Sequence, residues 1–270
     1  MDSPSFDSDT AVRRLDDLEF EAEIADDRWW TTGGPHGGFL ATVLLRSLTQ
    51  ALDDPDRPPR SLTVHYTGAP RQGALSIRVT IEKKGRTSAT LAARATQGDR
   101  LVALALAAFS SAFPGEDFST ARMPEVPPAD AVEAPPMHSA PNFTKNFEYR
   151  YCIGAAPFTS AEETVSGGWL RLREPRVLDL ALAATYADAW TPAIFPRMTG
   201  FMAVPTLDLT VHFRESLPLE GAKPEDFVLA VARTRVVHDG VLDEDTDIWS
   251  ADGRLLVQSR QLAALIPPPG

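Results

Sequence analysis

The feature that most constrains the fold of this chain is an internal repeat. Residues 62–66 read Leu-Thr-Val-His-Tyr and residues 209–213 read Leu-Thr-Val-His-Phe, 147 positions apart. The same offset relates Thr87 to Thr234, and each of these threonines follows an arginine. A third pair keeps the order at an offset of 154: Arg100-Leu101 and Arg254-Leu255. Three ordered matches in 270 residues predict two copies of one fold.

A proline-rich segment separates the two copies. Many of the 23 prolines of the chain fall between Pro114 and Pro141. Such a segment can hold neither a helix nor a central strand, so it reads as an exposed connector. The sequence therefore predicts an N-terminal unit at 1–113, a connector at 114–141 and a C-terminal unit at 142–270.

Each copy reads as one helix followed by antiparallel strands. In the first copy, apolar residues at helical spacing predict a helix over 38–52, between a glycine pair and Asp-Asp-Pro. The second copy repeats the pattern with a helix at 178–190. A Gly- and Asp-rich loop at 239–246 would absorb the seven added residues. The predicted strands are 61–67, 75–81, 88–96 and 101–110, then 207–213, 227–237, 246–250 and 255–265. Segment 101–110 is rich in alanine and would also suit a helix. An α+β fold in which a sheet wraps a central helix follows from this pattern.

Composition excludes several classes of function. A net charge of −11 argues against nucleic acid as a partner. The longest nearly apolar run, 101–109, is far shorter than the ~20 residues of a membrane-spanning helix, and the acidic N-terminus does not resemble a signal peptide. These features predict a cytoplasmic protein. The single cysteine, Cys152, excludes an intrachain disulfide, and the five histidines show no metal-ligand spacing, so no metal is expected.

Three segments carry a resemblance to a known family. Residues 34–39 read Gly-Pro-His-Gly-Gly-Phe, residues 186–188 read Tyr-Ala-Asp, and residues 206–213 read Thr-Leu-Asp-Leu-Thr-Val-His-Phe. In this order, within a duplicated chain, they resemble the double-hotdog acyl-CoA thioesterases, the thioesterase II or TesB-like family, over roughly 26–266. The resemblance implies two tandem hotdog units that hydrolyse acyl-CoA to free acid and CoA. It implies no cofactor beyond the CoA of the substrate, and it leaves a monomer and a homodimer open.

The resemblance also implies a catalytic water held by an aspartate, a hydroxyl residue and a glutamine in the second unit. Matched by position, these are Asp208, Thr234 and Gln261. The match of Thr234 needs a one-residue gap, which leaves Arg233 or Val236 as alternatives, and Gln258 is the substitute for Gln261. The equivalent residues of the first unit are Ser61, Thr87 and Ala107, which lack this combination. A catalytic site in the second unit alone is therefore expected.

Residues near the first helix are candidates for substrate binding. The free N–H groups at Gly37 and Gly38 suit a carbonyl or a phosphate, and His36 precedes them. Asp188, on the second helix, is the alternative base or a residue that supports the base.

Two other functions remain open at this stage. An enoyl-CoA hydratase of the related double-hotdog type would need an Asp–His pair, for which Asp188 with His36 or His212 is available. A non-catalytic acyl-CoA or acyl-carrier binding protein is the third reading. A covalent mechanism is disfavoured, because the chain has no Gly-x-Ser-x-Gly elbow and no base is placed beside Cys152.

Overall fold

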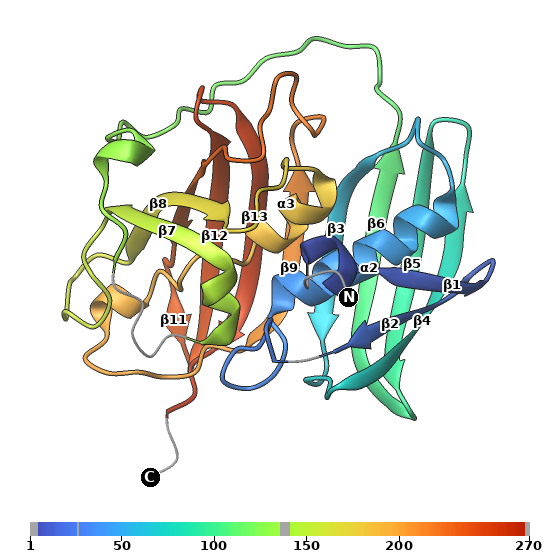
Figure 1. Cartoon of the computed structure of the whole chain (residues 1–270), viewed down its shortest axis with the longest axis horizontal. Helices are drawn as coiled ribbons and strands as arrows, with labels where there is room; N and C mark the ends of the chain where they lie inside the picture. The colour runs from blue at the N-terminus through green and yellow to red at the C-terminus, as the bar shows by residue number, and fades with distance from the viewer. Residues whose placement is uncertain (1–4, 26, 136–140, 268–270) are drawn as a thin grey trace.

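One antiparallel sheet of thirteen strands runs through the whole molecule (Figure 1). The computed structural model describes residues 5–25, 27–135 and 141–267. The strand order is β1-β2-β4-β5-β6-β3-β9-β13-β12-β10-β8-β7, with β11 paired to β12 outside this path. The first half holds α1 (Phe6–Asp9), β1 (Val12–Asp16), β2 (Glu19–Ile24), α2 (Gly37–Leu52), β3 (Pro59–Tyr66), β4 (Gly73–Lys84), β5 (Ser88–Gln97) and β6 (Arg100–Ser110). The second holds η1 (Ala129–Ala131), η2 (Asn142–Asn146), β7 (Phe147–Ile153), β8 (Val165–Leu172), α3 (Leu180–Tyr186), η3 (Phe195–Arg197), β9 (Thr206–Phe213), β10 (Val228–Arg233), β11 (Val237–His238), β12 (Val241–Ser250) and β13 (Leu255–Ala264).

The two repeated pentapeptides meet at the centre of this sheet. Strands β3 and β9 pair antiparallel, and Thr63 lies opposite Thr210, its equivalent 147 residues later. Their hydroxyl oxygens are 3.0 Å apart. An antiparallel pair in which equivalent residues face each other relates the two halves by an approximate two-fold axis. The predicted double-hotdog architecture with a continuous sheet is confirmed.

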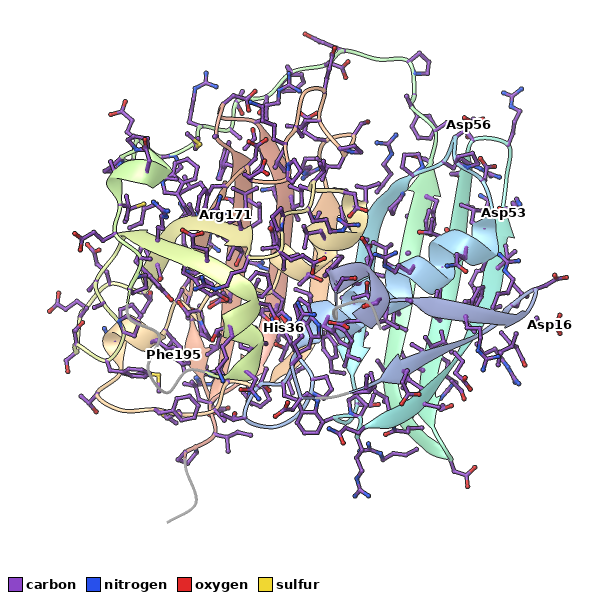
Figure 2. All side chains as sticks on the ribbon, viewed as in Figure 1. Asp16, His36, Asp53, Asp56, Arg171 and Phe195 are labelled. Carbon is purple, nitrogen blue, oxygen red and sulfur yellow. The ribbon has the colours of Figure 1, made fainter. Side chains whose placement is uncertain are left out.

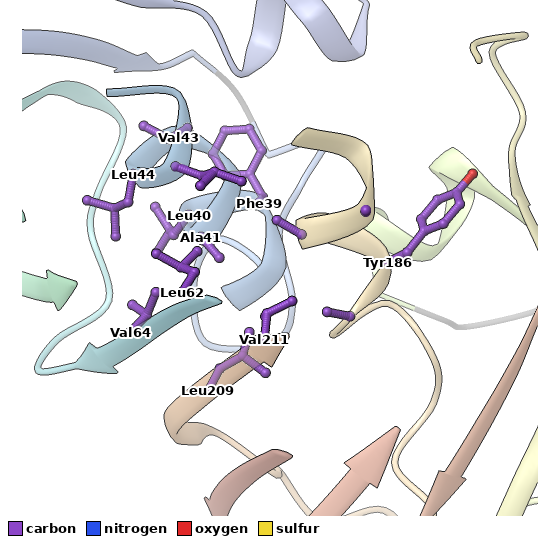
Figure 3. Packing of buried hydrophobic residues seen from close by; sticks show 14 of the residues in the cluster. Phe39, Leu40, Ala41, Val43, Leu44, Leu62, Val64, Tyr186, Leu209 and Val211 are labelled. Atoms are coloured by element: carbon purple, nitrogen blue, oxygen red, sulfur yellow. The ribbon is translucent and has the colours of Figure 1, made fainter. Parts of the chain in front are cut away.

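Helix α2 forms because its ends are marked and one face is apolar. The His36 side chain accepts a hydrogen bond from the N–H of Phe39 at the start, and Asp53 ends the helix in the left-handed conformation (φ 48°). Figure 3 shows Phe39, Leu40, Ala41, Val43 and Leu44 of this helix packed close to the apolar residues of β3 and β9. Burial of this face against the sheet fixes the helix on the inner face of the first unit.

Helix α3 is shorter than the helix predicted at 178–190. It begins after Asp179, whose side chain accepts from the N–H of Leu182, and it ends at Tyr186. Beyond the helix, the Trp190 ring packs against Tyr151 with centroids 4.8 Å apart. The carbonyl of Asp188 bonds the His36 ring rather than a later turn of helix. Tertiary contacts therefore end the helix where alanine-rich spacing alone would continue it.

The strands differ from the prediction in one instructive place. The loop predicted at 239–246 is instead a tight turn at Asp239-Gly240, both with positive φ (51° and 72°), followed by strand β12 from Val241. The added residues lengthen a hairpin rather than its loop. The alanine-rich segment 101–110 is the strand β6. Strands β1, β2, β7 and β8 lie towards the outer edges of the sheet and had no counterpart in the prediction.

The connector runs over one end of the molecule between the two halves (Figure 1). Residues 111–128 contain no helix or strand. The Trp169 indole N–H donates to the carbonyl of Pro127 at 2.8 Å, which fastens the connector to β8. The part of the proline-rich segment at 136–140 lies outside the described residues. None of the described helices is long and apolar enough to cross a membrane.

Candidate active site

Polar side chains meet on the inner face of the sheet where the two helices approach each other. Strand β13 turns the Gln261 side chain to this face, and only 8% of Gln261 is exposed. The Thr206 hydroxyl donates to Gln261 Oε1 at 2.8 Å. The Gln261 side chain also lies close enough to Asp188, two residues beyond α3, to lower the pKa of its carboxyl. One carboxylate, one hydroxyl and one amide therefore lie close together on this face, with Gln261 buried and Thr206 half-buried.

Asp188 is held against the start of α2. The N–H of Gly38 donates to Asp188 Oδ2 at 2.8 Å. Burial raises the pKa of Asp188 above its usual range, and His36, the Gly38 N–H and the Gln261 amide offset part of this rise. Just 9% of the side chain is exposed. A buried carboxylate at a helix N-terminus, with an elevated pKa, is suited to accept a proton near neutral pH.

The glycine pair is required by this close approach. A Cβ atom on Gly37 would lie 2.7 Å from Asp188 Oδ2. One on Gly38 would lie 2.6 Å from the carbonyl oxygen of Thr185. Both distances are shorter than real Cβ contacts, so only glycine lets α2 and α3 come together here. The sequence reasoning placed Gly37 and Gly38 near the site, and the structure brings them beside Asp188.

His36 lies at the meeting point of the two units (Figure 2), with 2% of its surface exposed. Its Nδ1 accepts from the N–H of Phe39, and its Nε2 faces the Asp188 carbonyl at 2.8 Å and Asp188 Oδ2 at 3.3 Å. The ring also stacks on Phe143. Both nitrogens are thus engaged by the protein, which disfavours the Asp–His acid–base pair that a hydratase would need. His212 is exposed on β9, on the face opposite the helices.

Asp208 does not join this cluster. It lies half-buried opposite Leu262, which is 41% exposed, whereas its neighbour Leu209 is fully buried and pairs with Gln261. Successive strand residues point to opposite faces, so Asp208 and Gln261 project to different sides of the sheet. The structure therefore does not bring Asp208 to the face of the sheet on which Gln261 lies.

Thr234 is buried but stands apart from Gln261. It follows the last residue of β10, and its N–H donates to the carbonyl of Thr164. Among the described residues its hydroxyl has no hydrogen-bond partner. The hydroxyl that reaches Gln261 belongs to Thr206. Of the alternatives, Arg233 pairs with Asp247, Val236 is exposed, and Gln258 bonds Arg214 and Asp247.

Sequence reasoning missed Thr206 for a physical reason. Simple alternation along β9 puts Thr206 on the same outer face as Asp208. The pairing shifts between Leu262 and Ala263, however, and leaves Leu207 as an extra residue, so that Thr206 pairs with the buried Ala263. This bulge turns Thr206 to the inner face. For Asp208 a signal was available, because its flanking residue Leu209 continues the apolar face of the strand with Val211.

Glu244 was also missed. It lies on β12 directly opposite Gln261, is 3% exposed, and accepts from Gln261 Nε2 at 3.1 Å. The N–H of Ala193 donates to its other oxygen at 2.6 Å. Burial raises the pKa of Glu244 to about 8, and the nearby Asp188 charge adds to the rise. Because residues 239–246 were predicted to form a loop, Glu244 could not be distinguished from the surface acids around it.

Comparison with known proteins gives the family. The model of the acyl-CoA thioesterase C-terminal domain matches residues 121–265, and that of the N-terminal domain matches residues 26–110. None of the curated proteins compared with the chain matches it.

Solved structures agree in fold. A conserved protein of unknown function with a hot dog fold from Alicyclobacillus acidocaldarius has a TM-score of 0.89 at 24% identity, over 99% of this chain and 100% of that chain. A protein described as a thioesterase II from Thermobifida fusca YX has a TM-score of 0.80 at 25% identity, over 96% and 97%. The acyl-CoA thioesterase II TesB2 from Mycobacterium marinum has a TM-score of 0.79 at 18% identity, over 98% and 100%. With one family model spanning more than half of its length and the second spanning most of the first unit, the chain belongs to the double-hotdog acyl-CoA thioesterases.

Proposed function

We propose that this thioesterase hydrolyses acyl-CoA to a free acid and CoA with a water bound between Asp188, Thr206 and Gln261. The observation that carries the proposal is the proximity of these three side chains at the start of α2: Thr206 donates to Gln261, the Gly38 N–H donates to Asp188, and Gln261 lowers the pKa of Asp188. They supply the carboxylate, hydroxyl and amide that the family resemblance implies. Asp188 replaces Asp208 and Thr206 replaces Thr234 in the assignment.

The proposed reaction needs no covalent enzyme intermediate. Asp188 takes a proton from the water as the water oxygen attacks the thioester carbonyl. Thr206 and Gln261 hold the water in one orientation, because a hydroxyl and an amide offer both donors and acceptors. The tetrahedral intermediate then breaks its C–S bond, and the departing CoA sulfur receives the proton from Asp188.

The start of α2 supplies the electrostatic part of the proposal. The N–H of Gly38, predicted to be free for substrate, instead donates to Asp188 Oδ2. The positive end of the helix dipole beside Gly37 and Gly38, and not this N–H, would therefore stabilise a developing oxyanion. His36 keeps this turn in place by bonding both the Phe39 N–H and the Asp188 carbonyl. Its role is therefore to position Asp188 and the glycine pair.

Thiol release from a chain-length panel of acyl-CoAs tests the assignment. We expect Asp188→Asn to lower kcat by about 10²-fold or more, because the general base is lost. Asp208→Asn is the matched control, since it makes the same change on the opposite face of the sheet, and it should keep the kcat of the unmodified protein. Loss of activity in Asp208→Asn with activity retained in Asp188→Asn would overturn the site.

The same panel separates the other two functions. Hydration of an enoyl-CoA without thiol release would support the hydratase. Tight binding of acyl-CoA with no turnover of any chain length would support a binding protein. Either result would overturn the proposed hydrolysis.

A further inference from the structure

Glu244 is a buried acid that the proposed reaction does not use. It lies at the same level of the sheet as Gln261, on the neighbouring strand and the same inner face. Its two oxygens accept from Gln261 Nε2 and from the Ala193 N–H. Among the described residues no Lys or Arg hydrogen-bonds to it or pairs with it. An isolated carboxyl in an apolar sheet is costly, and a role in the adjacent site would explain its presence.

The hydrogen bonds around Gln261 show what that role is. Gln261 Oε1 accepts from the Thr206 hydroxyl, so its amide group faces away from Thr206. The amide nitrogen donates to Glu244 Oε1 at 3.1 Å, and the same side chain lowers the pKa of the nearby Asp188 carboxyl. Without Glu244, the amide would lose the partner that fixes its rotation.

We propose that Glu244 is a positioning residue, which as a neutral acid holds the Gln261 amide with Nε2 turned towards Asp188. This inference rests on the proposed hydrolysis at Asp188, Thr206 and Gln261. Glu244 acts through Gln261 and does not touch the reacting atoms.

The protonation state of Glu244 follows from its surroundings. Two acids act on Glu244: Asp188, which follows α3, and Asp243, the preceding residue on its own strand. Among the described residues, its hydrogen-bond partners are two N–H donors, from Gln261 and Ala193. Burial raises the pKa of Glu244 to about 8. Because the proposed reaction needs an ionised Asp188 to accept the proton of the water, a neutral Glu244 leaves a single negative charge on the two acids.

Ionisation of Glu244 would oppose the reaction. A second negative charge beside Asp188 would disfavour the oxyanion of the transition state and would draw the Gln261 amide away from the water. The neutral form of Glu244 is thus the form that supports catalysis. This predicts a loss of kcat on the alkaline side that belongs to Glu244 and not to Asp188.

The pH dependence of kcat, measured by thiol release, tests the proposal. For the unmodified protein we expect kcat to fall above pH 8, by up to about 10-fold per pH unit. Glu244→Gln cannot ionise and keeps one of the two acceptor roles. We expect it to lose no more than about 5-fold in kcat at pH 7 and to lack the alkaline fall. Asp245→Asn is the matched control on the outer face of the same strand, and it should keep the alkaline fall.

A truncation separates positioning from packing. Glu244→Ala removes both acceptors, and we expect kcat to fall about 10-fold with KM changed by less than about 2-fold. Rescue by Glu244→Gln would then show that a polar partner for Gln261 is what matters. An alkaline fall that persists in Glu244→Gln, or a folded Glu244→Ala protein with full kcat, would overturn the proposal.

A measurement that does not depend on turnover keeps the two proposals distinct. The infrared band of a protonated carboxylic acid should be present at pH 7, should titrate near pH 8 and should be missing in Glu244→Gln. If no acyl-CoA is hydrolysed but this band behaves as expected, the proposed function fails while the neutral state of Glu244 stands. If hydrolysis occurs and the band is unchanged in Glu244→Gln, the assignment of Glu244 fails.

Discussion

The two hotdog units place different residues at the same point of the same strand ladder. In the second unit Gln261 of β13 lies between Leu209 of β9 and Glu244 of β12. In the first unit Ala107 of β6 lies between Leu62 of β3 and Leu91 of β5. Ala107 is 1% exposed and Leu91 is fully buried, so this level of the first sheet is closed by apolar packing. The strand pairing is the same in both units at this level, and the second unit alone carries the polar side chains that the proposed reaction uses.

The helices of the two units also differ, and here the first unit contributes the longer helix. Helix α2 of the first unit is 16 residues long and presents its glycine start to the site, whereas α3 of the second unit has seven residues and leaves Asp188 beyond its end. The Gly38 N–H and Asp188 are bonded across the two units. The proposed site therefore draws on both copies, and neither unit alone contains all of its residues.

The largest effect is expected when the buried acid of the second unit is introduced at the equivalent level of the first unit. In Leu91→Glu a carboxyl would enter the buried level beside Ala107, where no amide is available to bond it. We expect the free energy of unfolding to fall by about 4 kcal/mol. Ala92→Glu, one residue along on the opposite face, should cost less than about 1 kcal/mol. Denaturant unfolding of both variants measures the two losses of unfolding free energy. Equal losses would show that a carboxyl is no more costly at this buried level than on the opposite face of the strand.

A smaller effect is expected where the two units touch. In Gly38→Ala the new Cβ would meet the Thr185 carbonyl at 2.6 Å and the His36 ring at 2.9 Å, which forces α2 and α3 apart. We expect a loss of about 2–3 kcal/mol in unfolding free energy together with lower kcat, because Asp188 loses its alignment.

Gly33→Ala is the control for this variant, since nothing lies within 4 Å of its Cβ. Its unfolding free energy and kcat should match those of the unmodified protein. If Gly38→Ala left both quantities unchanged, the close approach of the helices would have no part in the site.

The smallest effect concerns the shared centre of the sheet. In Thr63→Val the hydroxyl that meets Thr210 is lost, while the shape and strand preference are kept. We expect a loss of about 0.5–1 kcal/mol in unfolding free energy and an unchanged kcat. Thr63→Ser keeps the hydroxyl and tests whether that bond is responsible. A change in kcat would mean that the pairing of β3 with β9 influences the proposed site.

The two-fold architecture was predictable because it rests on local signals. Each pentapeptide, the helical spacing after the glycine pair and the alternation along the strands can be read from a short stretch of chain, and the match between the two pentapeptides indicates the duplication. The weak point was the segment at 239–246, where acidic residues suggested a loop. There Glu244 faces inward between outward-facing acids, and a strand with a polar inner residue cannot be separated from a loop by composition.

What the sequence by itself determined is the duplication, the α+β hotdog class and the family, and it also pointed to Gln261 and the glycine pair of the proposed site. The tertiary structure alone decided which acid and which hydroxyl accompany them. A bulge at Leu207 turns Thr206 inward while Asp208 stays on the outer face, and the early end of α3 brings Asp188 to Gly38. Both outcomes depend on register and helix packing between residues up to 150 positions apart, and neither is encoded in the spacing of neighbouring residues.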